Sequence, residues 1–76
     1  MEDKVKKIMS EIFVCEYDDI NIETNIDSLN NWDSLQHIIF IVNLEEAFQV
    51  EFSPEEIVEM ISFVKIIEIV KKHVIN

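Results

Sequence analysis

The chain of 76 residues contains no glycine at all, although nearly half of its residues are hydrophobic. Hydrophobic content of this order excludes low-complexity disorder. Without glycine, the chain cannot form the glycine-rich loops that hold phosphates in dinucleotide-binding and P-loop enzymes. We therefore expect one small folded domain over residues 1–76. Its margin of stability is small, because a domain of this size buries only about 60% of its unfolded surface.

Two long segments have apolar residues at helical spacing. The spacing predicts an amphipathic helix over residues 3–14 and a second helix over residues 34–49. Asp33 is a good N-cap for the second helix, and Gln36 stands three residues later, where it completes a predicted capping box. Apolar residues occur on nearly every side of this helix, which predicts that it is central and well buried.

Two shorter segments complete the predicted fold. Ser53, Pro54 and Glu56 form a helix start signal with a capping box, and a short helix over residues 54–60 follows. A fourth helix is predicted over residues 63–74, because apolar residues keep helical spacing and cations stand in its last turn. The fold class is therefore all-α, a small irregular four-helix bundle with a long loop between its first and second helices.

The segment over residues 15–32 lacks a regular pattern and is rich in residues that favour turns and local side-chain hydrogen bonds. A loop of this length is uncommon in so small a domain unless it is functional or fastened by apolar side chains. Trp32 is expected to anchor the loop, and Cys15 to end the first helix as a small apolar residue. The candidate anchors are Ile20, Ile22, Ile26, Leu29 and Trp32.

Acidic side chains outnumber basic ones by 16 to 6, which gives a net charge of −10. Residues 15–61 contain twelve of the acidic residues and no Lys or Arg. A negative field of this kind repels a phosphate backbone, so nucleic acid is not an expected partner. The field either speeds encounters with basic protein surfaces or serves only to keep the protein soluble.

The sequence also predicts neither a membrane-spanning protein nor a metal-binding one. The longest apolar run, Ile38–Val42, is too short to span a bilayer, and the N-terminus lacks an export signal, so we expect a cytoplasmic protein. Cys15 is the only cysteine, which excludes an internal disulfide, and with two histidines it cannot build a thiolate zinc site. The acidic loop also lacks the spacing of a calcium-binding EF-hand.

Ser34 is the candidate functional residue. If Asp33 takes the cap, Ser34 falls at the first helical position with its hydroxyl outward, where a phosphodiester would lie beside unpaired N–H groups. The alternative is that the two residues only cap the helix. His37 lies one turn on, but no carboxylate is placed to orient it, so we expect no hydrolase. On an early helical turn we expect His37 to be solvated, the alternative being contact with the arm or a partner surface.

Three motifs occur in an order and at a spacing that resemble the acyl carrier protein family. The motifs are Trp32-Asp33-Ser34-Leu35, Leu44-Glu45-Glu46-Ala47-Phe48 and Phe52-Ser53-Pro54-Glu55-Glu56-Ile57. The resemblance extends over essentially the whole chain. It implies that Ser34, flanked by Asp33 and Leu35, receives phosphopantetheine from coenzyme A through a separate phosphopantetheinyl transferase. The thiol of this arm would then carry acyl or aminoacyl groups as thioesters.

The chain departs from fatty-acid carriers at several positions. Gln36 and Ile39 stand where those carriers are usually acidic, and Trp32 replaces a small or aliphatic residue. The resemblance is therefore greater to carriers of specialised pathways. An exposed Ile39 would offer partner enzymes an apolar contact, whereas a buried Ile39 would belong to the core.

The expected partner surface combines Gln36 and Ile39 with acidic residues that meet Arg and Lys on enzymes, unless those residues are only a solvated face. The acidic candidates are Glu45, Glu46, Glu51, Glu55, Glu56 and Glu59. The resemblance implies three kinds of partner: the transferase, a loading ligase and downstream acyl-transfer enzymes. We expect a monomeric, non-enzymatic carrier. The alternative is an unmodified acidic helical interaction domain in which Ser34 is only structural.

Overall fold

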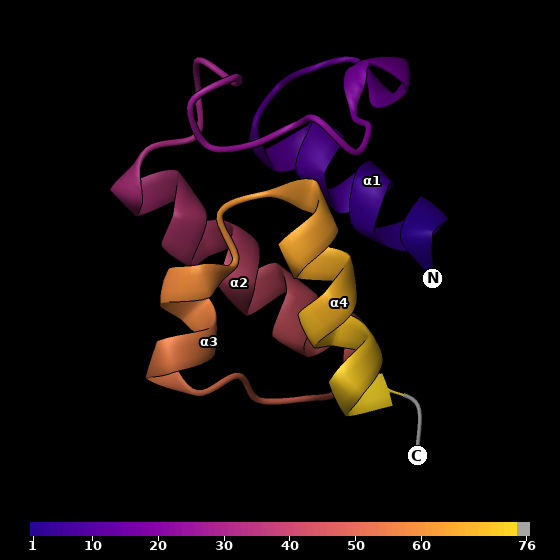
Figure 1. Cartoon of the computed structure of the whole chain (residues 1–76), viewed down its shortest axis with the longest axis vertical. Helices are drawn as coiled ribbons and strands as arrows, with labels where there is room; N and C mark the ends of the chain where they lie inside the picture. The colour runs from indigo at the N-terminus through magenta and orange to yellow at the C-terminus, as the bar shows by residue number, and fades with distance from the viewer. Residues whose placement is uncertain (75–76) are drawn as a thin grey trace.

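The computed structural model describes residues 1–74, which form four α-helices joined by loops (Figure 1). The helices are α1 (Glu2–Ile12), α2 (Ser34–Phe48), α3 (Pro54–Glu59) and α4 (Phe63–Val74). These bounds confirm the predicted all-α bundle, and each boundary lies within two residues of the predicted one. Among residues 1–74, no helix is both long and apolar enough to cross a bilayer.

Side-chain caps fix the starts of α2 and α3. The carboxylate of Asp33 accepts the Gln36 N–H at 2.8 Å, which confirms Asp33 as the N-cap. Ser53 Oγ accepts the Glu56 N–H at 3.2 Å and the Glu56 carboxylate accepts the Ser53 N–H at 2.9 Å, so this predicted capping box is complete. The capping box predicted at α2 is wrong, because the Gln36 side-chain amide donates to the Ile12 carbonyl at 2.8 Å. Gln36 therefore ties α2 to the end of α1.

The core is built from α1, α2, α4 and the loops between the helices. Its buried apolar residues are Val5, Met9, Phe13, Ile20, Trp32, Phe40, Ile41, Leu44, Phe52, Met60, Phe63, Ile66, Ile67, Ile69 and Val70. The short helix α3 contributes the partly buried Ile57 and no fully buried residue. Since a fully buried aliphatic side chain contributes about 1.5–3 kcal/mol, α3 gains less from apolar burial than its neighbours and depends more on polar contacts.

Helix α2 has apolar residues on both faces but buries only one of them, so the prediction that it is buried on nearly every side is wrong. The residues on its core face are His37, Phe40, Ile41 and Leu44. Its outer face leaves four apolar side chains exposed: Leu35, Ile38, Ile39 and Val42. We call these four residues the outer α2 stripe. A bundle of four short helices has too few elements to surround a central helix, because a chain of this length has a high ratio of surface to volume.

The long loop crosses the top of the molecule in Figure 1 and leads from α1 to the start of α2. It contains one 3₁₀ turn, η1 (Tyr17–Asp19), that the sequence pattern did not predict. Ile22 is exposed, so its prediction as an anchor is wrong. The other predicted anchors are buried or partly buried: Ile20, Ile26, Leu29 and Trp32.

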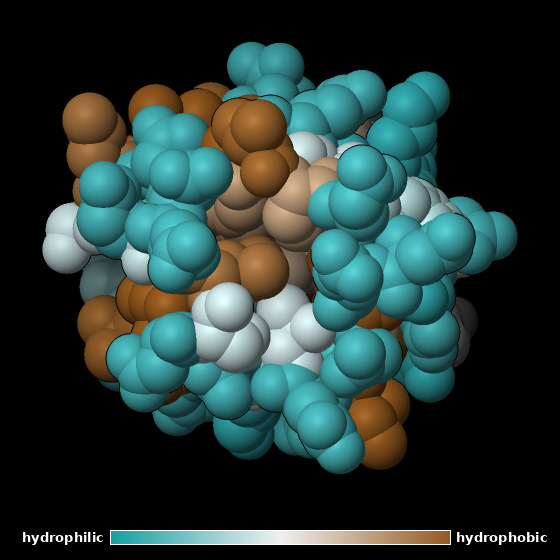
Figure 2. Space-filling model, turned by 90° about the horizontal axis from the view of Figure 1, so that it is seen from above, coloured by the Kyte–Doolittle hydropathy of each residue, from teal (hydrophilic) through white to brown (hydrophobic). Residues whose placement is uncertain are grey.

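A short antiparallel bridge pairs this loop with the connection between α3 and α4. The Ile26 N–H donates to the Ile61 carbonyl at 2.9 Å, and the Phe63 N–H donates to the Thr24 carbonyl at 2.9 Å. The bridge satisfies backbone groups that the loop would otherwise leave without partners over the core. Figure 2 shows the molecule from above, with an apolar area in the middle of this face and hydrophilic side chains around it.

Helix α1 ends in a backbone conformation that normally favours glycine. Val14 has a φ of 51°, and the Cys15 N–H donates to the Ser10 carbonyl at 3.1 Å, the bond that closes a Schellman motif. This left-handed conformation costs a residue with a Cβ about 1–2 kcal/mol, and a β-branched residue adopts it rarely. Cys15 lies beyond the helix, so its predicted place at the end of α1 is wrong.

Val14→Gly should stabilise the protein by about 1 kcal/mol, because glycine removes the Cβ penalty at a positive φ. The side chain of Val14 is 76% exposed and contributes little packing. Urea unfolding measures the change. Val58→Gly is the matched control, since Val58 is 72% exposed but lies within α3, where glycine weakens a helix by about 0.5 kcal/mol relative to an ordinary residue. Loss of stability in both variants would contradict the left-handed assignment of Val14.

Candidate functional site

Ser34 is the first residue of α2 and is exposed at the surface. The Asp33 carbonyl accepts the His37 N–H at 2.8 Å, which makes this bond the first of the helix. The N–H groups of Ser34 and Leu35 precede it, so no helical carbonyl faces them. The hydroxyl of Ser34 therefore lies at the positive end of the helix dipole, beside N–H groups that suit an anion.

The residues around Ser34 are held against the end of α1. The last carbonyls of a helix lack helical donors, and here loop and α2 side chains supply them. Gln36 donates to the Ile12 carbonyl, and the side-chain amide of Asn31 donates to the Phe13 carbonyl at 3.0 Å. Trp32 stacks on the Phe13 ring with the ring centroids 4.7 Å apart. We call residues 31–36, fixed in this way, the Ser34 junction.

His37 is buried, with 8% of its surface exposed, so the prediction of a solvated side chain is wrong. The Trp32 indole N–H donates to His37 Nδ1 at 3.0 Å, and His37 Nε2 lies 2.8 Å from the Ile57 carbonyl. Both ring nitrogens are thus engaged with groups other than Ser34. The imidazole is a contact between the loop, α2 and α3.

The outer α2 stripe begins beside Ser34. Its side chains are exposed at Leu35 (68%), Ile38 (52%), Ile39 (38%) and Val42 (47%). Of the two alternatives for Ile39, the structure favours the exposed position over a place in the core. Because residues three and four apart share a face of a helix, the stripe is continuous along the outer face of α2. Exposed apolar surface of this kind is a candidate region for contact with other proteins.

Two of the acidic candidates make contacts within the chain. The carboxylate of Glu45 accepts the Phe52 N–H at 3.0 Å, and Glu56 closes the α3 capping box. The other four acidic candidates are exposed: Glu46, Glu51, Glu55 and Glu59. The set of carboxylates at the surface is therefore smaller than the sequence predicted.

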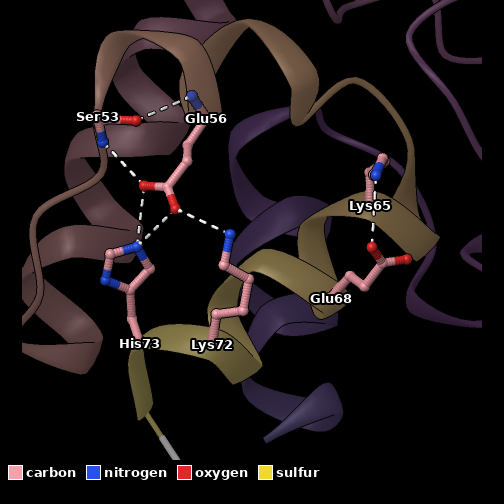
Figure 3. Close-up of polar contacts among 6 residues, drawn as sticks. All are labelled: Ser53, Glu56, Lys65, Glu68, Lys72 and His73. Carbon is pink, nitrogen blue, oxygen red and sulfur yellow. Dashed lines mark hydrogen bonds and ion pairs between the residues drawn. The ribbon is translucent and has the colours of Figure 1, made fainter.

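Glu56 joins the start of α3 to the end of α4, as Figure 3 shows. Its two carboxylate oxygens lie 2.9 and 3.0 Å from His73 Nε2, and Lys72 Nζ lies 3.6 Å away. The bond from the Ser53 N–H lowers the pKa of Glu56 below its ordinary value of 4.5, and His73 and Lys72 lower it further. Glu56 therefore stabilises the fold in its charged form.

Comparison with known proteins identifies the family. Residues 3–70 match the family described as phosphopantetheine attachment site, and this match includes the Ser34 junction. The chain belongs to this family. A search of curated proteins returned no match.

The phosphopantetheine attachment family explains the geometry at the start of α2. Its members bear phosphopantetheine as a covalent cofactor, so this chain is a phosphopantetheine carrier, and the resemblance to acyl carrier proteins is confirmed. The structure fits the group, since an exposed hydroxyl and two N–H groups without helical partners lie together at the first turn of α2. Attachment at Ser34, with Asp33 and Leu35 as its neighbours, stays a prediction.

The contact between Trp32 and His37 was missed by reasoning from the sequence. Two signals were present. A buried indole N–H needs an acceptor, and His37 lies on the same helical face as Phe40 and Leu44, which are core residues. Together they indicate an inward histidine.

Glu56→Gln should destabilise the protein at neutral pH, because glutamine keeps the capping geometry but removes the charge that His73 and Lys72 face. The pKa of Glu56 is lowered in the folded protein. The stability that its charge contributes is therefore present above the ordinary pKa of 4.5 and is lost as the pH falls through the folded pKa. Urea unfolding at pH 7 and in acid measures the difference from the parent chain, which should shrink in acid.

Glu55→Gln is the control, because Glu55 is exposed beside Glu56. It should change stability little at either pH. If the difference in unfolding free energy between Glu56→Gln and the parent stayed constant with pH, the charge of Glu56 would make no contribution to stability.

Proposed function

We propose that the chain holds acyl or aminoacyl intermediates as thioesters on a phosphopantetheine arm at Ser34 and delivers them to biosynthetic enzymes. A phosphopantetheinyl transferase adds the arm. The Ser34 oxygen forms a bond to the phosphorus that carries the pantetheine of coenzyme A, the nucleotide part leaves, and the transferase takes the hydroxyl proton. The further partners are a loading ligase and downstream acyl-transfer enzymes in the cytoplasm.

The placement of Ser34 carries this proposal. Asp33 makes the capping bond, which leaves the Ser34 hydroxyl without that structural task. The bonds from Gln36 and Asn31 to the end of α1 fix the junction in space. A serine on a fixed helix start is accessible to a modifying enzyme, and the resulting phosphodiester lies beside the N–H groups of the first turn.

The histidine next to Ser34 on α2 and the single cysteine both support a carrier that performs no chemistry itself. His37 uses both ring nitrogens in contacts with Trp32 and Ile57, so it supplies no base for a nucleophilic serine. Partial burial raises the pKa of the Cys15 thiol, and Asp19 and Glu16 raise it further, which disfavours the reactive thiolate. We therefore propose that catalysis lies with the partner enzymes.

The proposed docking surface is the outer α2 stripe with acidic residues at its edge. Glu46 lies one turn beyond Val42 on the same face and is exposed, as Glu55 on α3 is. Ile39 supplies the apolar contact, and the carboxylates face basic side chains of the enzyme. An apolar Ile39 and the buried Trp32 favour a specialised pathway over fatty-acid synthesis. Gln36, Glu45 and Glu56 also stay candidates for the docking surface. Their side chains make contacts within the chain, so only the atoms that these contacts leave exposed could meet an enzyme.

Ser34→Ala should abolish modification. The parent chain, incubated with coenzyme A, magnesium and a broad-specificity phosphopantetheinyl transferase, should gain the mass of one phosphopantetheine, because Ser34 supplies the attachment hydroxyl. Intact-protein mass spectrometry measures the gain. Ser10→Ala, which removes a hydroxyl on α1, is the control and should be modified like the parent. If the parent gains no mass with several transferases, the unmodified interaction domain becomes the better hypothesis.

Ile39→Ala should raise the KM of the transferase for the carrier by roughly fivefold, because a truncated apolar contact at an interface commonly loses about 1 kcal/mol. The turnover number should change little. Val64→Ala on α4 is the matched control, since Val64 is 44% exposed and Ile39 is 38% exposed. Equal KM values for the two variants would remove the outer α2 stripe from the docking surface.

A further inference from the structure

The two partners of His37 determine where its proton lies. An indole N–H can only donate, so Nδ1, 3.0 Å from Trp32 Nε1, must accept and carries no proton. A backbone carbonyl can only accept, so Nε2, 2.8 Å from the Ile57 oxygen, must donate. The imidazole is therefore held as the tautomer with its proton on Nε2.

This single ring joins three segments: the Ser34 junction, the first turn of α2 and α3. Trp32 belongs to the Ser34 junction and stacks on Phe13 at the end of α1. His37 itself stands in the first turn of α2, and Ile57 lies in α3. Both bonds are at least partly shielded from water, because Trp32 is 4% and His37 is 8% exposed. A hydrogen bond in such a place is costly to leave unmade.

Helix α3 depends on this bond more than the other helices do. It has six residues and no fully buried side chain, so little apolar burial holds it against α2. Its start is tied to α4 through Glu56 and His73, and its later part is tied to α2 through the Ile57 carbonyl. The Ile57 bond therefore fixes where α3 lies relative to the outer α2 stripe.

We propose that His37 is a positioning residue for the carrier: its Nε2 bond to Ile57 holds α3 in the place that a modifying enzyme recognises beside Ser34. The Nδ1 bond from Trp32 fixes the tautomer that this contact requires. The exposed Val58 follows Ile57 directly, so the same bond places an apolar side chain of α3 for contact. This proposal rests on the proposed function, because Ser34 is taken as the site of the arm.

Two substitutions separate the bonds of His37. In His37→Gln, the amide nitrogen lies near the place of Nε2 and can still donate to Ile57. In His37→Asn, the amide oxygen lies near the place of Nδ1 and can still accept from Trp32, but nothing reaches Ile57. Each variant keeps one bond, so both should fold with a similar loss of stability. Trp32 is the only tryptophan, and its fluorescence reports that the junction is intact.

The KM of the phosphopantetheinyl transferase should rise roughly fivefold in His37→Asn, the effect of one lost hydrogen bond, and stay within about twofold of the parent in His37→Gln. The turnover number should change little in either. Hydrogen exchange at the amides of α3 should quicken in the Asn variant alone. A purely structural histidine would affect both variants equally, and equal KM values or equal exchange would overturn the proposal.

Failure of the proposed function has a different signature. In that case, the parent chain gains no mass from coenzyme A with any transferase. The exchange measurement then still decides whether His37 holds α3, because it does not depend on modification of Ser34. Fast exchange in α3 of the parent chain itself would also overturn the proposal.

Discussion

The contact between Trp32 and the end of α1 is the constraint on which the rest of the structure depends. Stacking on Phe13 places the end of the long loop over the core, and the Trp32 indole then engages His37 in the first turn of α2. The carbonyls that end α1 accept side-chain amides from the loop and from α2. One aromatic ring thus connects α1, the loop and α2, and His37 extends the connection to α3.

The helices were predictable because their ends carry local chemical signals. Ser53, Pro54 and Glu56 set the start of α3 through bonds within four residues, and Asp33 does the same for α2. The prediction that α2 is buried failed for a different reason. Hydrophobic spacing shows which residues are apolar, but exposure depends on how many neighbours the bundle can place around a helix.

The position of the candidate site could be predicted from the sequence, but the contacts that hold it in place could not. Ser34 follows a capping residue within a recognisable motif, so its place at a helix start follows from local rules. The bonds from Gln36 to Ile12 and from His37 to Ile57 join residues distant in the chain. Local patterns hold no information about such pairs, and the first of them replaced a capping box that local rules favoured.

The bridge between the loop and the α3–α4 connection has a consequence for the order of folding. It pairs residues around Asn25 with residues around Ser62, so closing it carries an entropic cost that contacts within helices avoid. Helical bundles dominated by local contacts usually fold fast. This pairing, by contrast, forms only when the chain closes the long segment between Asn25 and Ser62. We expect the loop that leads to Ser34 to be completed last. An enzyme that recognises the finished junction would then act on the folded carrier and pass over the nascent chain.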